Sequence, residues 1–319
     1  MSVQPDLPEV YRGQQRGSRW SRVSYGLYAA REPERELARD LRAWTLVLPA
    51  ESSFTHLTAA RLRGWWLPNS VAHPVFAALP DNGFCPRRAG LIASRHRQPL
   101  PFELLSGVRV TSGAETLLAA SRDLGLIDLA ILADSALRLG HTTITELQVA
   151  AAQRRRGAPM LRELIPLLDQ RSESPWESVM RVLHKAAEIE VTPQHVITDD
   201  DGQFVARADL WLVGTRRIHE YDGAIHRERN VHRSDLNRDR RLIGSNWERM
   251  GFTAPELLHD GAAVISSADQ ALGRRWDHNR LTRWRSLVAA SLFSPSGQTR
   301  VLSRWGRTEP PKLATDRGF

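Results

Sequence analysis

The sequence is poor in two residue types that many active sites use. Cys85 is the single cysteine among 319 residues, which excludes an intrachain disulfide and a zinc site built from thiolates. We expect its thiol to be a small buried or half-buried group and not a nucleophile. Lysine occurs only as Lys185 and Lys312, so nearly all of the positive charge comes from arginine.

Long apolar runs are missing as well. No stretch of about 18 apolar residues is available to span a membrane, and the sequence does not start with a charged and then apolar leader. We therefore expect a cytoplasmic protein with no membrane partner. An apolar content of 41% and a charged content of 25% are ordinary for a globular protein, and the length allows two or three domains.

The net charge of +8 favours a polyanionic partner such as DNA. A high arginine content is also typical of GC-rich genomes, so charge alone adds only modest support. We leave open whether the last segment binds nucleic acid through stacking side chains or docks as a structural extension. The predicted segments are an N-terminal arm or degenerate winged-helix region at 1–48 (with a strand at Val23–Tyr28), an α+β domain at 49–170, an α/β domain at 172–272 and a basic Arg/Trp-rich tail at 273–319.

The third segment has the pattern of an α/β domain. Ser174-Pro175 is typical of a helix start, because proline is well tolerated in the first helical turn. Strands are predicted at Val191–Ile197 and on both sides of a turn at Gly214-Thr215. A helix near 233–245 and a strand at Trp247–Phe252 follow. This order predicts a mixed sheet flanked by helices.

The hairpin around Gly214 and Thr215 places two acidic side chains opposite each other. If these two residues form a two-residue turn, Asp209 pairs with Glu220 across the strands. Directly opposed side chains have Cβ atoms about 5 Å apart, and like charges at that spacing repel. A divalent cation between the carboxylates removes the repulsion, so the pattern indicates a metal site.

Further acidic residues converge on the same place by their spacing. Asp222 points to the same side as Glu220, two residues earlier, and Glu177 lies on the helix that opens the segment. Oxygen ligands without a thiol suit Mg²⁺ or Mn²⁺. We expect Asp209 and Glu220 to hold a metal, and Glu177 to hold a second metal or to orient a water. A solvated edge hairpin is the alternative reading.

Other nearby residues can serve a phosphodiester substrate. His226 is a candidate base or leaving-group acid, and Arg181 or Arg238 are candidate phosphate contacts. The structural alternatives are a helix salt bridge between Arg181 and Glu177, and an ion pair of Arg238 with Asp235. The remaining histidines of this segment are expected to be surface or core residues.

The third segment contains the stretches SPWESVMRVL, VARADLWL, HEYDGAIH and DLNRDRRLIGSNWERMGFT, and the pair Pro193-Gln194. Together these resemble the Vsr-like family, the branch of PD-(D/E)XK nucleases related to very-short-patch repair endonucleases. The resemblance implies a restriction-endonuclease-like fold and a magnesium-dependent endonuclease, acting in DNA repair or in defence against foreign DNA.

Carried over residue by residue, the resemblance makes Asp209 and Glu220 the core acidic pair and Glu177 the acidic residue of the first helix. Asp222 stands where the wider superfamily has lysine, and neither lysine of the chain is placed to replace it. His226 or a neighbouring arginine would have to take that role, or activity is lost. The Vsr-like branch often lacks this lysine.

The second segment contains the stretches FTHLTAARLRGWWLP, VRVTSGAETLLAA and LADSALRLG. These are similar to the antitoxin region of the AbiEi-type abortive-infection family, which implies a DNA-binding or partner-binding front half. The leading hypothesis is therefore a metal-dependent DNA endonuclease. A catalytically inactive DNA-binding regulator or antitoxin is the alternative, followed by an interaction scaffold, and a homodimer stays open.

Overall fold

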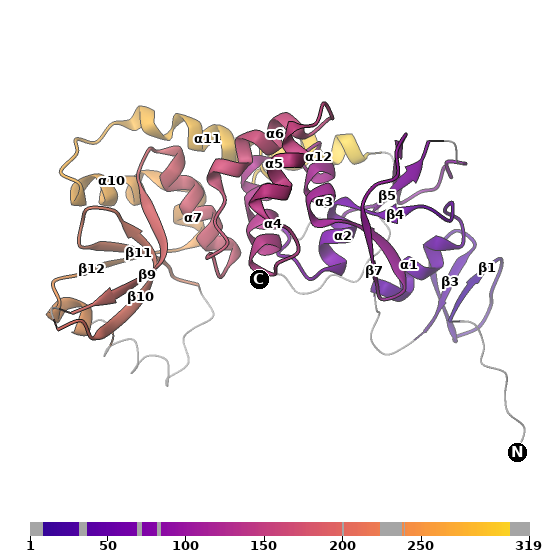
Figure 1. Ribbon diagram of the computed structural model, residues 1–319, viewed down its shortest axis with the longest axis horizontal. Helices are drawn as coiled ribbons and strands as arrows, with labels where there is room; N and C mark the ends of the chain where they lie inside the picture. Colours follow the sequence, from indigo (N-terminus) through magenta and orange to yellow (C-terminus); the bar gives the residue numbers. More distant parts are fainter. Residues whose placement is uncertain are drawn as a thin grey trace, which may run out of the picture. The chain divides into compact units, whose positions relative to one another are not determined.

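The computed structural model shows a mixed α/β protein with three sheets (Figure 1). Its described residues contain no helix that is long and apolar enough to cross a membrane. The four consecutive segments of the sequence analysis stay a prediction. The structure divides the chain into two compact units, each built from ranges that are not consecutive. The described residues are 9–31, 37–68, 72–81, 84–199, 201–223, 238 and 240–306. Unit 1 comprises Met1–Asp123, Thr145–Leu161 and Thr299–Phe319, and unit 2 comprises Leu124–Ile144 and Arg162–Gln298.

Unit 1 begins with a three-stranded sheet in the order β1-β3-β2. The predicted single strand at Val23–Tyr28 is wrong, because the chain turns at Gly26, which has a φ of +62° that favours glycine. Helix α1 (Leu37–Thr45) contributes Leu41 and Trp44 to a core that also contains Phe54 of the next sheet. The strands are β1 (Val10–Arg12), β2 (Trp20–Ser24) and β3 (Leu27–Ala30).

The second sheet of unit 1 has five strands in the order β6-β5-β4-β8-β7. Its central strand, β4, consists only of Ser53 and Phe54, a length that leaves no detectable alternation in the sequence. Helices α2 (His56–Leu62) and α3 (Gly113–Ala120) belong to the same unit. The strands are β4 (Ser53–Phe54), β5 (Val75–Pro80), β6 (Leu91–His96), β7 (Phe102–Leu105) and β8 (Val108–Thr111).

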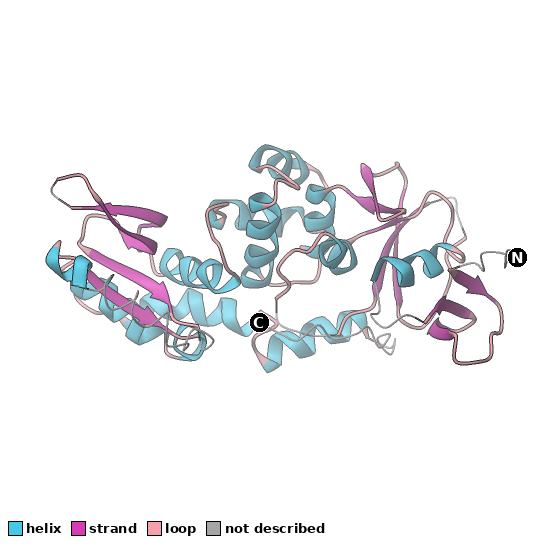
Figure 2. Ribbon diagram, turned by 90° about the horizontal axis from the view of Figure 1, so that it is seen from below, coloured by secondary structure: helices cyan, strands magenta, loops and turns pink. Residues whose placement is uncertain are grey.

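Unit 2 contains the third sheet, with four strands in the order β12-β11-β10-β9 (Figure 2). Strands β9, β10 and β11 are antiparallel neighbours, whereas β12 runs parallel to β11, so the predicted mixed sheet is confirmed. Arg238 and residues 240–244 are helical and precede β12. The strands are β9 (Val191–Thr198), β10 (Phe204–Leu212), β11 (Arg217–Tyr221) and β12 (Glu248–Phe252).

Helix α7 (Pro175–Ala186) packs against this sheet and against α4 (Leu126–Arg138). The apolar residues Val179, Met180 and Leu183 are buried, as the helical spacing of the sequence indicates. The remaining elements are α5 (Ile144–Ala152), α6 (Ala158–Leu164), η1 (Ile165–Leu167), α9 (Ala254–His259), α10 (Gly261–Ala271), η2 (His278–Leu281), α11 (Thr282–Ala289) and α12 (Pro295–Trp305).

Two tryptophans of the C-terminal tail pack within the units, whereas Trp276 is 42% exposed. Trp284 is buried and its Nε1 donates to the Leu257 carbonyl at 3.1 Å in unit 2. Trp305 is also buried, and its Nε1 donates to Asp123 Oδ2 at 3.2 Å in unit 1. For Trp284 and Trp305 these contacts favour a docked structural extension, since buried rings cannot stack on bases.

Candidate functional site

The first turn of α7 fixes the side chain of Glu177. Ser174 is the N-cap and its side chain accepts a hydrogen bond from the Glu177 amide at 3.2 Å, so the predicted helix start is confirmed. Glu177 is 7% exposed. Its Oε2 accepts from the Glu173 amide and from Gln194 Nε2, both at 2.8 Å. The segment that precedes α7 and strand β9 therefore each supply one donor that fixes this carboxylate.

The hairpin of β10 and β11 has the predicted register but a different turn. Leu210 pairs with His219 and Trp211 with Ile218, which places Asp209 opposite Glu220. Four residues connect the strands instead of two, so the two-residue turn is wrong. The Thr215 amide donates to the Leu212 carbonyl at 3.1 Å across Gly214, whose φ is +83°. This geometry is that of a type II turn, which requires glycine at the third position.

Asp209 carries the most perturbed carboxyl of the sheet. Burial is the largest cause and the negative charge of Glu177 the next, and together with Glu220 they raise its pKa from 3.8 to about 7. A hydrogen bond at 2.9 Å from the Tyr221 amide to Oδ2 and the charge of Arg238 act in the opposite direction. Oδ1 accepts no hydrogen bond from the residues that the structure describes. Asp209 therefore has one oxygen available to a cation.

Two arginines neutralise Glu220. Arg238 pairs with both of its oxygens, with Nη1 at 3.1 Å from Oε2, and also donates from Nη2 to the Arg207 carbonyl at 2.9 Å. Arg249 on β12 donates from Nε to Glu220 Oε2 at 2.5 Å and from Nη2 to Asp222 Oδ1 at 2.6 Å. Within the described residues the acidic pair of the hairpin is thus asymmetric, because Glu220 forms ion pairs and Asp209 forms none.

Asp222 and Gly251 lie in close contact across β11 and β12. A Cβ atom at Gly251 would lie 1.8 Å from Asp222 Oδ2, so only glycine leaves room for this carboxylate. The Asp222 amide also donates to the Phe252 carbonyl at 2.9 Å. The sequence contains no signal that would have identified Arg249 or Gly251, since their roles depend on the parallel pairing of the two strands.

The predicted phosphate contact by Arg181 is wrong, because the side chain is buried and paired inside the protein. Its side chain is 1% exposed and forms an ion pair with Asp134, which is also buried. Asp134 further accepts from Ser178 Oγ and from the Asp169 amide. Arg181 therefore stabilises the contact of α7 with α4 and cannot reach a ligand at the surface. Arg238 is paired with Glu220. His226 and Asp235 lie outside the described residues, so their predicted roles stay predictions.

His184 and His219 are core residues, as expected. His184 Nδ1 lies 2.7 Å from the Met180 carbonyl and its Nε2 lies 2.9 Å from His219 Nδ1. His219 Nε2 lies 3.2 Å from Ser267 Oγ. Burial is the largest cause that lowers the pKa of both rings, to about 4 for His184. Both imidazoles are therefore neutral near pH 7 and link α7, β11 and α10.

The carboxylates of Glu177, Asp209 and Glu220 are suitable ligands for a divalent cation, but their positions match a metal site only in part. Carboxylate oxygens are the ligands that Mg²⁺ and Mn²⁺ prefer, and a cation would relieve the charge that raises the Asp209 pKa. Across the described ranges, however, no three side chains of the metal-binding types are placed to hold one ion. Glu220 would have to exchange a guanidinium contact for the cation.

The chain is similar to two proteins of Mycobacterium tuberculosis, from strains CDC 1551 and H37Rv, both described as uncharacterized. Each is 32% identical over 164 residues, which are 51% of this chain and 58% of the relative. The chain therefore spans little more than half the length of these relatives. No protein-family model matches it, and no solved structure is significantly similar.

Proposed function

We propose that unit 2 carries a phosphodiester-hydrolysing site of a metal-dependent DNA endonuclease. The observation that carries the proposal is the buried Asp209 carboxyl on β10, whose pKa is raised to about 7 by burial first and then by the charges of Glu177 on α7 and Glu220 on β11. Carboxylates gathered at the cost of mutual repulsion are typical of functional sites.

The order of elements in unit 2 supports the same proposal. Along the chain, a helix is followed by three antiparallel strands, a helical segment and a fourth strand. The four strands form one mixed sheet, in which the fourth is parallel to the third. This order is what the resemblance to the Vsr-like nucleases implies, and the three carboxylates occupy the elements that the resemblance assigns to them. The net charge of +8 agrees with a polyanionic substrate.

Each side chain then has a distinct role. Asp209 would hold a Mg²⁺ or Mn²⁺ ion with Glu220, once Glu220 exchanges a guanidinium contact for the cation, and Glu177 would orient a water. The ion, when bound, would supply a Lewis acid and an activated water. Asp209 contributes its unpaired oxygen, and Glu177 is kept in place by Gln194 and the Glu173 amide. Arg249 and Arg238 place positive charge beside Glu220, where a phosphate would need it.

A second candidate is a catalytically silent DNA-binding regulator or antitoxin that uses the same sheet as a platform. The observation that favours it is the pairing of Glu220 with two arginines and of Asp222 with Arg249, which already balances both of these carboxylates without a metal. Plasmid nicking by wild type and by Asp209→Asn, with Mg²⁺ or Mn²⁺, distinguishes the two candidates. The endonuclease requires cleavage that the variant loses.

A further inference from the structure

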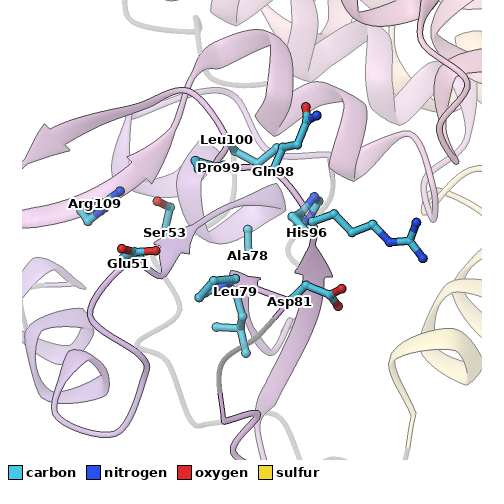
Figure 3. A pocket seen from close by; sticks show the side chains of 12 residues that line it. Glu51, Ser53, Ala78, Leu79, Asp81, His96, Gln98, Pro99, Leu100 and Arg109 are labelled. Atoms are coloured by element: carbon cyan, nitrogen blue, oxygen red, sulfur yellow. The ribbon is translucent and has the colours of Figure 1, made fainter.

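A pocket of about 630 Å³ opens in unit 1, beside the short central strand of the five-stranded sheet (Figure 3). Strand β4 begins at Ser53, which pairs with Ala78 of β5, while Phe54 pairs with Val110 of β8. Strand β5 continues to Pro80 beyond this pairing. The two-residue length of β4 therefore leaves a space between its neighbours, and its volume is within the usual range for small-molecule sites.

Arg109 lines this pocket with an unused guanidinium. Its Cζ lies 3.6 Å from the ring centroid of Phe102, and this stacking fixes the plane of the group. The guanidinium makes no hydrogen bond or ion pair with any residue in the described part of the chain, and its Nε is buried without an acceptor. A buried donor without a partner is costly, so the arrangement favours an external acceptor.

The remaining walls combine polar side chains of both charges with apolar surface. Glu51 lies beside Ser53, and Arg97 and Gln98 also line the pocket (Figure 3). Ser53, a buried residue, lies on the same side of the pocket as Arg109, and Asp81 and His96 lie on the other side (Figure 3). Leu79 and Leu100 add apolar contacts. Burial is the main cause that lowers the pKa of His96, so this ring adds no charge near neutral pH. The donors at one end and the apolar wall beside them suit an amphipathic anion.

We propose that this pocket binds a small organic oxyanion, with its phosphate or carboxylate group on the Arg109 guanidinium and the Ser53 hydroxyl. The apolar body of the ligand lies against Leu79 and Leu100. The guanidinium fork matches both head groups, because each presents two oxygens in one plane to parallel N–H donors. The site lies within unit 1 and does not depend on the function proposed for unit 2.

Calorimetric titration of the full chain with three matched probes tests this proposal. The probes are 1-naphthyl phosphate, 1-naphthoate and the neutral 1-naphthol, which share one apolar body and differ in head group. The variant Arg109→Gln removes the guanidinium. Arg16→Gln is the control, since Arg16 is an exposed arginine of unit 1 outside the pocket. Saturable binding of at least one anion, weakened about tenfold or more by Arg109→Gln and unchanged by Arg16→Gln, is expected.

The two anionic probes distinguish a phosphate ligand from a carboxylate ligand. Arg109→Lys is the second variant, because lysine keeps the charge and a similar stem and loses only the fork, and its affinity is expected between those of wild type and Arg109→Gln. Either of two results overturns the proposal: neither anion saturates the wild-type chain, or 1-naphthol binds as tightly as the anions. Equal anion affinity of wild type and a folded Arg109 variant overturns it as well.

Discussion

Arg249 Nη2 lies 2.6 Å from Asp222 Oδ1, and the same guanidinium donates through Nε to Glu220. The Asp222 carboxylate therefore holds the guanidinium of Arg249, on the neighbouring strand, next to the acidic pair Asp209 and Glu220. Asp222 stands where the resemblance would place a lysine, and Arg249 supplies a positive charge beside that position. Asp209 lies in the same sheet, forms no ion pair with any residue that the structure describes, and keeps a raised pKa.

The first prediction concerns the pH dependence of stability. The folded Asp209 carboxyl holds its proton up to about pH 7, whereas the unfolded one releases it near 3.8, so the free energy of unfolding falls as the pH rises through this window. Asn cannot ionise, so Asp209→Asn removes this fall in the free energy of unfolding. The fall is a few kcal/mol at most, because each pKa unit corresponds to about 1.4 kcal/mol. Thermal melts should show an advantage of the variant that grows from about pH 4 to pH 7 and then stays constant. The exposed control Asp201→Asn should show no such trend, and a parallel trend in both variants would contradict this assignment.

The second prediction concerns divalent cations. Binding to the folded state alone raises the melting temperature by mass action, and the cation competes with the proton on Asp209. Mn²⁺ should therefore stabilise the wild-type chain more at about pH 8 than at about pH 5, and Asp209→Asn much less at either pH. Scanning calorimetry with Mn²⁺ and with Na⁺ at matched ionic strength provides the measurement. Equal stabilisation of wild type and variant would place the cation elsewhere.

The third prediction concerns Arg249. Removing a positive charge beside Glu220 should increase the affinity for Mn²⁺, because the guanidinium and the cation compete for the same oxygen. Titration of Arg249→Gln should show a several-fold lower Kd than wild type. Arg216→Gln is the control, since that guanidinium is exposed and, among the described residues, donates only to the Ser245 carbonyl. A weaker affinity in Arg249→Gln would show that the arginine supports the cation site instead.

The fourth prediction concerns Gly251. An alanine Cβ would collide with the Asp222 carboxylate, which must then leave Arg249. We expect Gly251→Ala to lower the free energy of unfolding by about 1–3 kcal/mol, the usual cost of overpacking. Gly244→Ala is the matched control, because no atom lies within 4 Å of a Cβ placed there. Denaturant unfolding measures both, and equal stability of the two variants would refute the close contact.

The fifth prediction concerns the buried ion pair of Arg181 and Asp134. Arg181→Met leaves the Asp134 carboxylate without its cation, and breaking a buried pair in this way costs about 3–5 kcal/mol. Because Arg181 is buried, DNA affinity of the folded variant should match that of wild type. Urea unfolding and a DNA-binding titration test the two halves. Normal stability with reduced DNA affinity would restore the original expectation of a phosphate contact.

Local patterns predicted part of this site. The opposition of Asp209 and Glu220 followed from strand periodicity, since any register with the same turn centre pairs the same residues. The start of α7 followed from the Ser174 cap. The contacts of Arg249 could not be predicted, because they depend on how β12 pairs with β11 after a connection of more than 20 residues.

Long-range packing explains the other differences. The partner of Arg181 lies on α4, 47 residues away, and no periodicity of a single helix identifies it. The pocket of unit 1 was not predicted either, because a central strand as short as Ser53–Phe54 has no sequence signature.

Nicking of supercoiled plasmid by the full chain in Mg²⁺ or Mn²⁺ tests the central claim most directly. The account predicts cleavage by wild type that disappears in Asp209→Asn and in Glu177→Gln, and that chelation of the metal stops. Equal cleavage by wild type and Asp209→Asn would contradict the claim and place the activity at another site or in a contaminant. No cleavage of double-stranded, single-stranded or mismatched DNA by wild type would contradict it in favour of the silent DNA-binding platform.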